Sequence, residues 1–187
     1  TYQYVDSANN TGTVTRTVTV IDAPDLTPPT ASVEYSTTGA TNQDVIVTLT
    51  GASEAITITN NSGLTTQTFT ANGTGEFLFV DGAGNTGSVS ISVSNIDKSL
   101  PVLTLNGSGT VSILSGSTYT ELGATYLDNV DGTGTLATPF SGSVNVNQTG
   151  SYVLTYQYVD SANNTGTVTR TVTVIDAPDL TPPTASV

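Results

Sequence analysis

The 187-residue chain contains no cysteine, methionine, tryptophan or histidine. Without histidine and cysteine it lacks the commonest general base and the thiolate nucleophile, so we predict that it is not an enzyme. Small domains without disulfides are expected either inside cells or on prokaryotic surfaces where other devices stabilise them. The Thr/Ser/Asn-rich, lysine-poor composition favours the second, and we expect an extracellular, cell-surface protein.

Basic residues are almost as scarce. Lysine and arginine total 3 against 15 aspartates and glutamates, which gives a net charge of −12. Such a chain repels phosphates and anionic lipids, so we expect neither a nucleic acid nor a membrane as a partner. No apolar run reaches the length of about 18 residues that a membrane-spanning helix needs.

A long exact repeat is the most informative feature that is present. Residues 1–33 recur letter for letter as residues 155–187, at an offset of 154 residues. The chain therefore reads as one period plus an overlap, a window on a longer array. Tandem repeats build length, so we predict a structural shaft or extender of a repetitive extracellular fibre or giant adhesin.

Alternating residues predict β-strands. Threonine and valine alternate over residues 13–20, where Arg16 falls on the valine face, and we expect its head to reach water near a strand end. No segment has a helical stripe, and Gly/Asn turns separate the short strands. These patterns predict an all-β fold of tandem immunoglobulin-like β-sandwiches in a linear array.

Two proline-marked joints, at 21–29 and 96–101, set the expected domain boundaries. Residues 27–97 form one domain type and residues 98–176 a second, expected to hold seven to nine strands. Residues 1–22 would be the last strands of a preceding copy, unfolded by themselves, and 177–187 a linker with the first strand of the next domain. The predicted core of the second domain is Leu103, Leu105, Leu122, Tyr152, Leu154, Tyr156, Val172 and Val174.

The second domain resembles a known family. The segments 101–107, 116–132, 150–156 and 160–165 are similar to a bacterial immunoglobulin-like module of long surface proteins, also appended to some insecticidal crystal proteins. Residues 27–97 resemble a second bacterial Ig-like type that is common in repeat adhesins. The resemblance implies stalks and extenders without catalysis. One departure is Thr133, where the family usually has a further aspartate.

Acidic residues are concentrated in the linkers and in loops expected at one end of each sandwich, where linker and loops converge. Carboxylates that meet there repel one another without a cation, and mixed oxygen ligands suit Ca²⁺. We therefore predict calcium sites at both joints. The candidate ligands are Asp22, Asp25, Glu54, Asp81 and Asn85 at the first joint, and Asp97, Asp128, Asp131, Asp160 and Asn163 at the second.

Several alternatives stay open. The aspartates could serve turn formation alone. The tyrosines at 152, 156 and 158 could form a sugar-stacking face, which would make the chain a carbohydrate- or receptor-binding module, or they could be core residues with Tyr152 as a tyrosine corner. The chain could also be a subunit of a filament that self-assembles by strand exchange. Expected partners are neighbouring repeats of the same chain and lateral copies of the same fibre.

Overall fold

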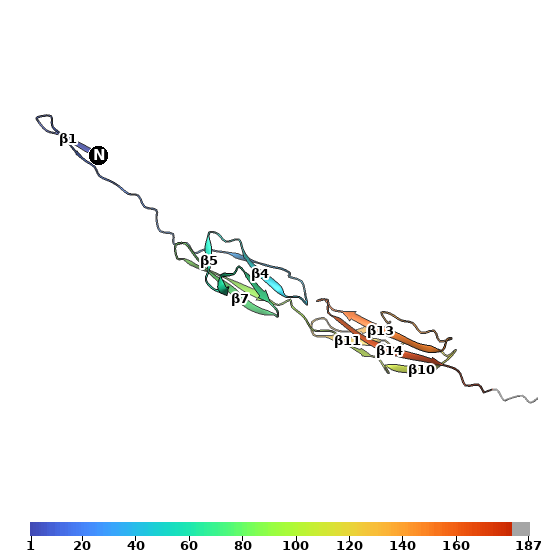
Figure 1. The fold of residues 1–187 in the computed structure, drawn as a ribbon. Coiled ribbons are helices and arrows are strands. Elements are labelled where there is room, and N and C mark those ends of the chain that lie inside the picture. Colours follow the sequence, from blue (N-terminus) through green and yellow to red (C-terminus); the bar gives the residue numbers. More distant parts are fainter. Residues whose placement is uncertain (181–187) are drawn as a thin grey trace, which may run out of the picture.

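The structure is a computed structural model that describes residues 1–180. Within these residues there is no α-helix, and hence none long and apolar enough to cross a membrane. Along the chain, an N-terminal β-hairpin is followed by an extended segment without strands and then by two β-sandwiches (Figure 1). The all-β prediction is confirmed. The predicted first strand of a next domain lies at 181–187, outside the described residues.

The first sandwich pairs two three-stranded sheets, in the orders β3-β4-β6 and β5-β7-β8. All of the strand pairs within these two sheets are antiparallel. A short 3₁₀ turn, η1 (Asn61–Gly63), separates β5 from β6. The strands are β3 (Ser32–Tyr35), β4 (Val45–Thr50), β5 (Ile56–Ile58), β6 (Thr66–Phe69), β7 (Gly73–Asp81) and β8 (Thr86–Val93).

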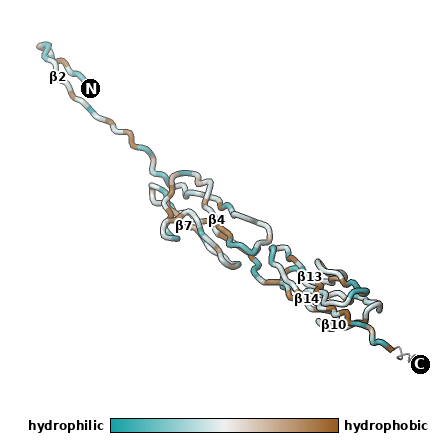
Figure 2. The backbone as a smooth tube through the Cα atoms, turned by 45° about the vertical axis from the view of Figure 1, so that its right-hand side comes forward, coloured by the Kyte–Doolittle hydropathy of each residue, from teal (hydrophilic) through white to brown (hydrophobic). Residues whose placement is uncertain are grey.

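Its core follows from the alternation in the sequence. Val45 and Val47 on β4 face Phe77 and Phe79 on β7, and all four side chains are buried. Every second residue of a strand points to the same face, so each sheet contributes one apolar face to the sandwich. Figure 2 shows the apolar positions distributed along both sandwiches between polar turns.

The second sandwich repeats this plan with sheets β12-β11-β9 and β10-β14-β13. It has six strands, so the expected seven to nine was wrong, because residues 137–149 contribute only an isolated bridge at Ser141. β10 pairs with β14 in parallel. The strands are β9 (Val102–Leu105), β10 (Thr110–Leu114), β11 (Ala124–Asp128), β12 (Gly132–Leu136), β13 (Gly150–Val159) and β14 (Thr165–Ile175).

The predicted core of the second sandwich is correct except at one position. Leu122 is 61% exposed, because its neighbour Glu121 takes the inward position in this irregular segment. The other predicted residues are buried or half-buried: Leu103, Leu105, Tyr152, Leu154, Tyr156, Val172 and Val174.

The tyrosines are packing residues. Tyr156 is fully buried, and Tyr158 stacks on Tyr126 with ring centroids 3.6 Å apart. The Tyr152 hydroxyl donates to the Gln148 carbonyl oxygen at 2.9 Å, as in a tyrosine corner. The predicted core role is confirmed, and the buried ring of Tyr156 is not available to stack on a sugar.

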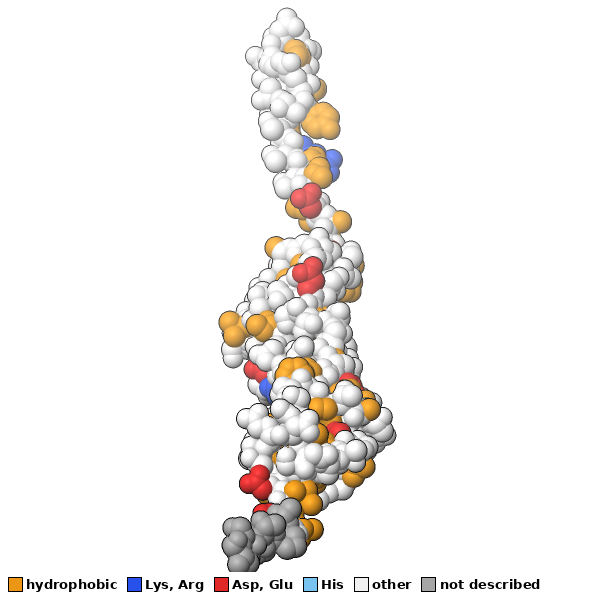
Figure 3. All heavy atoms as spheres, turned by 90° about the vertical axis from the view of Figure 1, so that its right-hand side faces the viewer, with side chains coloured by type: hydrophobic (Ala, Val, Ile, Leu, Met, Phe, Trp, Pro, Cys, Tyr) orange, Lys and Arg blue, Asp and Glu red, His pale blue; other side chains and the backbone are white. Residues whose placement is uncertain are grey.

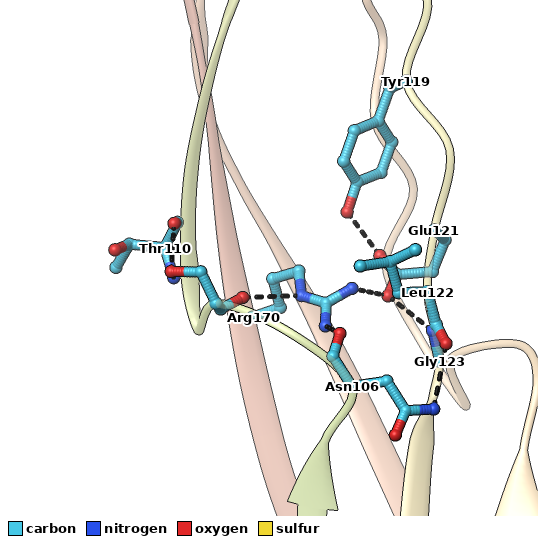
Figure 4. A network of polar contacts seen from close by, with 8 residues as sticks. Asn106, Thr110, Tyr119, Glu121, Leu122, Gly123 and Arg170 are labelled. Atoms are coloured by element: carbon cyan, nitrogen blue, oxygen red, sulfur yellow. Dashed lines mark hydrogen bonds and ion pairs between the residues drawn. The ribbon is translucent and has the colours of Figure 1, made fainter.

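Arg16 is exposed, as predicted, although it lies outside the strands. Arg170, at the equivalent position of the second copy, does not reach solvent. It lies inside β14 and is 1% exposed. Its guanidinium forms an ion pair with Glu121 and donates to the carbonyl oxygens of Asn106 and Ser108, at 2.6 and 3.0 Å (Figure 4). The buried charge is tolerated because each of these donors has an acceptor.

Glu121 is the acceptor that makes this burial possible. The Tyr119 hydroxyl and the Gly123 amide also donate to its carboxylate. Burial by itself would raise the pKa of Glu121, but these donors together with Arg170 outweigh it and lower the pKa to about 2. The pair is therefore ionised throughout the physiological range.

The N-terminal hairpin consists of β1 (Tyr2–Val5) and β2 (Thr11–Val14). All of residues 15–26 are exposed and without strand structure. The identical sequence at 155–176 is built into the second sandwich, where β14 runs without a break to Ile175. The same sequence thus adopts a longer strand when a partner sheet is present. The prediction that residues 1–22 are unfolded by themselves is wrong for residues 2–14, because local hydrogen bonds hold β1 and β2 together as a hairpin, although two strands by themselves bury no face.

Candidate cation site at the joint between the two sandwiches

The two sandwiches touch through the loop before β4 and the turn between β13 and β14. The Asn42 amide donates to the Ala162 carbonyl oxygen at 3.1 Å, and its side chain donates to the Asn163 carbonyl oxygen at 3.2 Å. Beside them, Lys98 in the linker pairs with Asp44 at 2.7 Å. Asp44, which is not among the predicted ligands, therefore also lies at the joint.

A tight turn positions the first acidic side chain. Asp160 Oδ1 accepts the backbone amides of Ala162 and Asn164 at 2.9 and 2.7 Å. The Asn164 carboxamide then donates both to Asp160 Oδ2, at 2.7 Å, and to the carbonyl oxygen of Asp97, at 3.0 Å. Asn164 therefore ties the linker to the turn.

Three carboxylates converge at this point. Asp97, Asp128 and Asp160 each place an oxygen within 4.8 Å of the others, and their exposed fractions are only 7%, 4% and 5%. At an effective dielectric constant of about 20, two unit charges 4.8 Å apart repel by about 3.5 kcal/mol. The cluster is therefore costly unless something compensates the charge.

Two of these carboxylates are only half satisfied by the protein. Asp97 Oδ1 accepts the Ser99 amide at 3.0 Å, and Asp128 Oδ1 accepts the amides of Val130 and Asp131 at 2.8 Å. The Oδ2 atoms of Asp97 and Asp128 are buried and accept no hydrogen bond. Buried acceptors normally have a partner, so these two oxygens fit a bound cation.

The first sandwich carries the corresponding set at its own N-terminal end, formed by Asp25, Glu54 and Asp81. Asn85 donates to the Asp25 carbonyl oxygen at 3.1 Å and to Asp81 Oδ2 at 2.8 Å, as Asn164 does in the second. The hydrogen bond from Asn85 lowers the pKa of Asp81 despite its burial. Burial, and then the charges of Asp25 and Asp81, raise the pKa of Glu54.

The two sets differ in how closed they are. Asp25 is exposed and Glu54 half-buried, whereas all three carboxylates of the second set are buried. The segment before Asp25 is exposed over residues 15–24, so in this structure the surroundings of the first set are open on the upstream side.

The structure gathers most, but not all, of the predicted ligands. Asp131 instead accepts the Ser161 hydroxyl and amide at 2.6 and 2.8 Å, which lowers its pKa. Asn163 is exposed and adopts a left-handed backbone with φ of 69°, and Asp22 is exposed in the linker. Asn164 was missed, although its spacing of four residues from the aspartate matches that of Asn85.

The turn occurs a third time, away from any joint. In the N-terminal hairpin, Asp6 accepts the amides of Ala8 and Asn10 at 2.9 and 2.8 Å, and the Asn10 side chain donates to Asp6 at 2.8 Å. The Asp-x-Ala-x-Asn turn thus forms by local hydrogen bonding alone. Only Asp97 in the linker and Asp128 at the end of β11 need a further explanation.

One comparison with known proteins concerns the second sandwich. Residues 103–174 match the family model described as a bacterial surface protein, Ig-like domain. This segment is a bacterial Ig-like domain of surface proteins. The match covers β9 to β14 and therefore includes the buried Arg170 as well as Asp128 and Asp160.

A second comparison covers the whole chain. The chain is 31% identical over 210 aligned residues to hyalin of Strongylocentrotus purpuratus, and the match takes in 100% of the chain. It spans only 17% of the length of hyalin. The chain therefore corresponds to a small part of that relative, and the family match supports a surface Ig-like module at residues 103–174.

Proposed function

We propose that the chain is a rigid extender in the shaft of an extracellular fibre or giant adhesin, and that calcium stiffens its joints. The exact 154-residue repeat and the end-to-end placement of two sandwiches support this role (Figure 1). The observation that carries it is the buried cluster of Asp97, Asp128 and Asp160 at the joint, with two carboxylate oxygens that accept no hydrogen bond.

Mechanical coupling comes from the position of Asp97 between the two sandwiches. Its amide donates to the Thr41 carbonyl oxygen at 2.8 Å, and this hydrogen bond attaches the linker to the first sandwich. Its carboxylate faces Asp128 and Asp160 of the second sandwich. A cation that binds all three carboxylates therefore ties both bodies to one short linker and resists bending at the joint.

The donor set favours Ca²⁺. Carboxylate oxygens are hard ligands, and the site has neither the histidine nor the cysteine that zinc prefers. Loops and a linker supply the oxygens, and such irregular sites suit the flexible coordination of Ca²⁺ better than the strict octahedron of Mg²⁺. Backbone carbonyls and water would complete the shell.

The remaining surface suits a shaft. The chain has only three basic side chains, and the face shown in Figure 3 is mostly uncharged with scattered acidic groups. A net charge of −12 disfavours close lateral association between copies in the absence of a cation. The partners that we propose are neighbouring repeats of the same chain and, when a cation is bound, lateral copies of the fibre. The role is structural rather than catalytic.

Equilibrium dialysis of the 187-residue chain against Ca²⁺ tests the proposal. We expect saturable binding that Mg²⁺ does not displace at equal concentration. Asp97→Asn should remove the site at the second joint, because it neutralises the one carboxylate of the cluster that the linker contributes. Asp22→Asn is the matched control, since that linker aspartate is exposed. Binding that is absent, or unchanged by Asp97→Asn, would refute calcium at this joint.

A further inference from the structure

The two sandwiches differ in how their N-terminal part is joined to their last strand. In the second sandwich, β10 pairs in parallel with β14 over all five of its residues, up to Ile175. In the first, an isolated parallel bridge between Thr41 and Ile96 stands in the same place. Ile96 and Ile175 are equivalent positions, because each lies eleven residues after the asparagine of the Asp-x-Ala-x-Asn turn.

Further hydrogen bonds reinforce the parallel pair of the second sandwich. The Thr171 amide donates to the Gly109 carbonyl oxygen at 2.8 Å, just before the pairing begins. The buried guanidinium of Arg170 reaches from β14 to the carbonyl oxygens of Asn106 and Ser108, at 2.6 and 3.0 Å. The last strand is therefore bonded to the turn before β10 as well as to β10 itself.

The first sandwich has less at this position. Its bridge consists of the Thr41 amide donating to the Asn95 carbonyl oxygen at 3.0 Å and the Asp97 amide donating to the Thr41 carbonyl oxygen at 2.8 Å. The Asn72 side chain holds the amide and the carbonyl of Ile96, at 2.8 and 2.9 Å. A single bridge and side-chain contacts thus replace a continuous pair of strands.

Tension along the chain loads these bonds in shear. The two sandwiches lie end to end, so tension passes through both in series (Figure 1). It enters each sandwich through the N-terminal strand and leaves through the last one, and so pulls two parallel segments in opposite directions along their length. Evenly spaced hydrogen bonds between such segments share the load and must break together. The N-terminal strands themselves do not differ, since β3–β4 and β9–β11 each have four residue pairs.

We propose that the first sandwich is the unit of the shaft that yields under tension, and that the second, held by the β10–β14 pair and Arg170, is the unit that bears the load. The inference rests on the proposed function, because a shaft is the part of a fibre through which tension passes. Resistance to forced unfolding is set by the unfolding rate, and more bonds loaded together make that rate slower. The first sandwich then releases its folded length while the second stays closed.

Single-molecule force spectroscopy of the full chain, in chelator so that calcium plays no part, tests the inference. The chain contains no cysteine, so thiol handles can be placed where force is to be applied. Ser99 is exposed in the linker, and Ser99→Cys provides a handle between the two sandwiches. Pulling from it to a cysteine added before Thr1 loads the first sandwich alone, and pulling to one added after Val187 loads the second alone. We expect the second sandwich to unfold at the higher mean force at every pulling speed.

Two variants separate resistance to shear from stability in general. Arg170→Met removes the bonds from β14 to the turn before β10 and should lower the unfolding force of the second sandwich. Tyr152→Phe is the control, because it removes the hydrogen bond from β13 to Gln148, away from β10. It should lower the melting temperature and leave the unfolding force unchanged.

A first sandwich that unfolds at an equal or higher force would overturn the inference, and so would equal losses of force from the two variants. The comparison of the two sandwiches needs no substitution in either core, so it stands even if Arg170→Met does not fold. Calcium binding is tested separately by the dialysis experiment, so a failed force hierarchy would leave the proposed function standing.

Discussion

Arg170→Met is expected to destabilise the second sandwich by about 3–5 kcal/mol, because it leaves the carboxylate of Glu121 in a largely buried site without its charge partner. Glu121 accepts from Arg170, Tyr119 and the Gly123 amide, and losing the cation removes the largest compensating charge. Chemical denaturation followed by circular dichroism measures the loss. Arg16→Met is the matched control with identical neighbours in sequence, and we expect a change within about 0.5 kcal/mol.

A double variant separates the contribution of the ion pair to stability from the contribution of side-chain packing. Arg170→Met combined with Glu121→Leu removes both charges, and we expect it to recover most of the lost stability. Equal losses from Arg16→Met and Arg170→Met would contradict the burial of only one of the two arginines. Limited trypsin digestion of the unmodified chain checks the same contrast: we expect cleavage after Arg16, which is exposed, and none after Arg170 inside β14.

Asp128→Asn is expected to raise stability in chelator and to lose most or all of that advantage in calcium. In chelator it removes one of three mutually repelling charges and gives the orphaned Oδ2 position a donor, so we expect a gain of about 1–3 kcal/mol. With Ca²⁺ at a hundredfold excess over Kd, the unmodified chain gains about 2.7 kcal/mol from binding, and the variant loses that gain. Thermal melting of the second sandwich in both conditions measures the two effects.

Asp22→Asn serves as the control for that experiment, because the residue is exposed and outside the cluster. We expect its melting to change little in either condition. If Asp128→Asn lowered the melting temperature in chelator, the orphaned carboxylate would have a stabilising role that does not involve a cation, and the interpretation of the cluster would be wrong.

The fold could be predicted from the sequence because its signal is local. Alternation of valine and threonine identified the strands and most of the core of the second sandwich. The environment of Arg170 could not be predicted in this way. The pattern placed the arginine on the valine face, but its partner Glu121 lies 49 residues away in a segment without strand structure. A long-range pair of this kind has no periodic signature.

The joint was predicted in part, for a similar reason. Convergence of linker and loops correctly brought together Asp97, Asp128 and Asp160. Asp131 follows Asp128 too closely in sequence for pattern alone to tell which of the two points to the linker. Asn163 was chosen over Asn164, although Gly84 at the equivalent position of the first sandwich, with φ of 95°, marks a left-handed turn residue. Calcium binding itself stays a prediction.

Small-angle X-ray scattering of the unmodified chain, in Ca²⁺ and in chelator, tests the central claim most directly. If a cation ties Asp97 to Asp128 and Asp160, the chain in Ca²⁺ should scatter as a stiffer rod. Its maximum dimension should be larger than in chelator, where the two sandwiches can bend about the linker. Asp128→Asn should scatter like the chelated chain in both conditions. Identical scattering of the unmodified chain with and without Ca²⁺ would contradict the account and leave stiffness to proline and direct contacts alone.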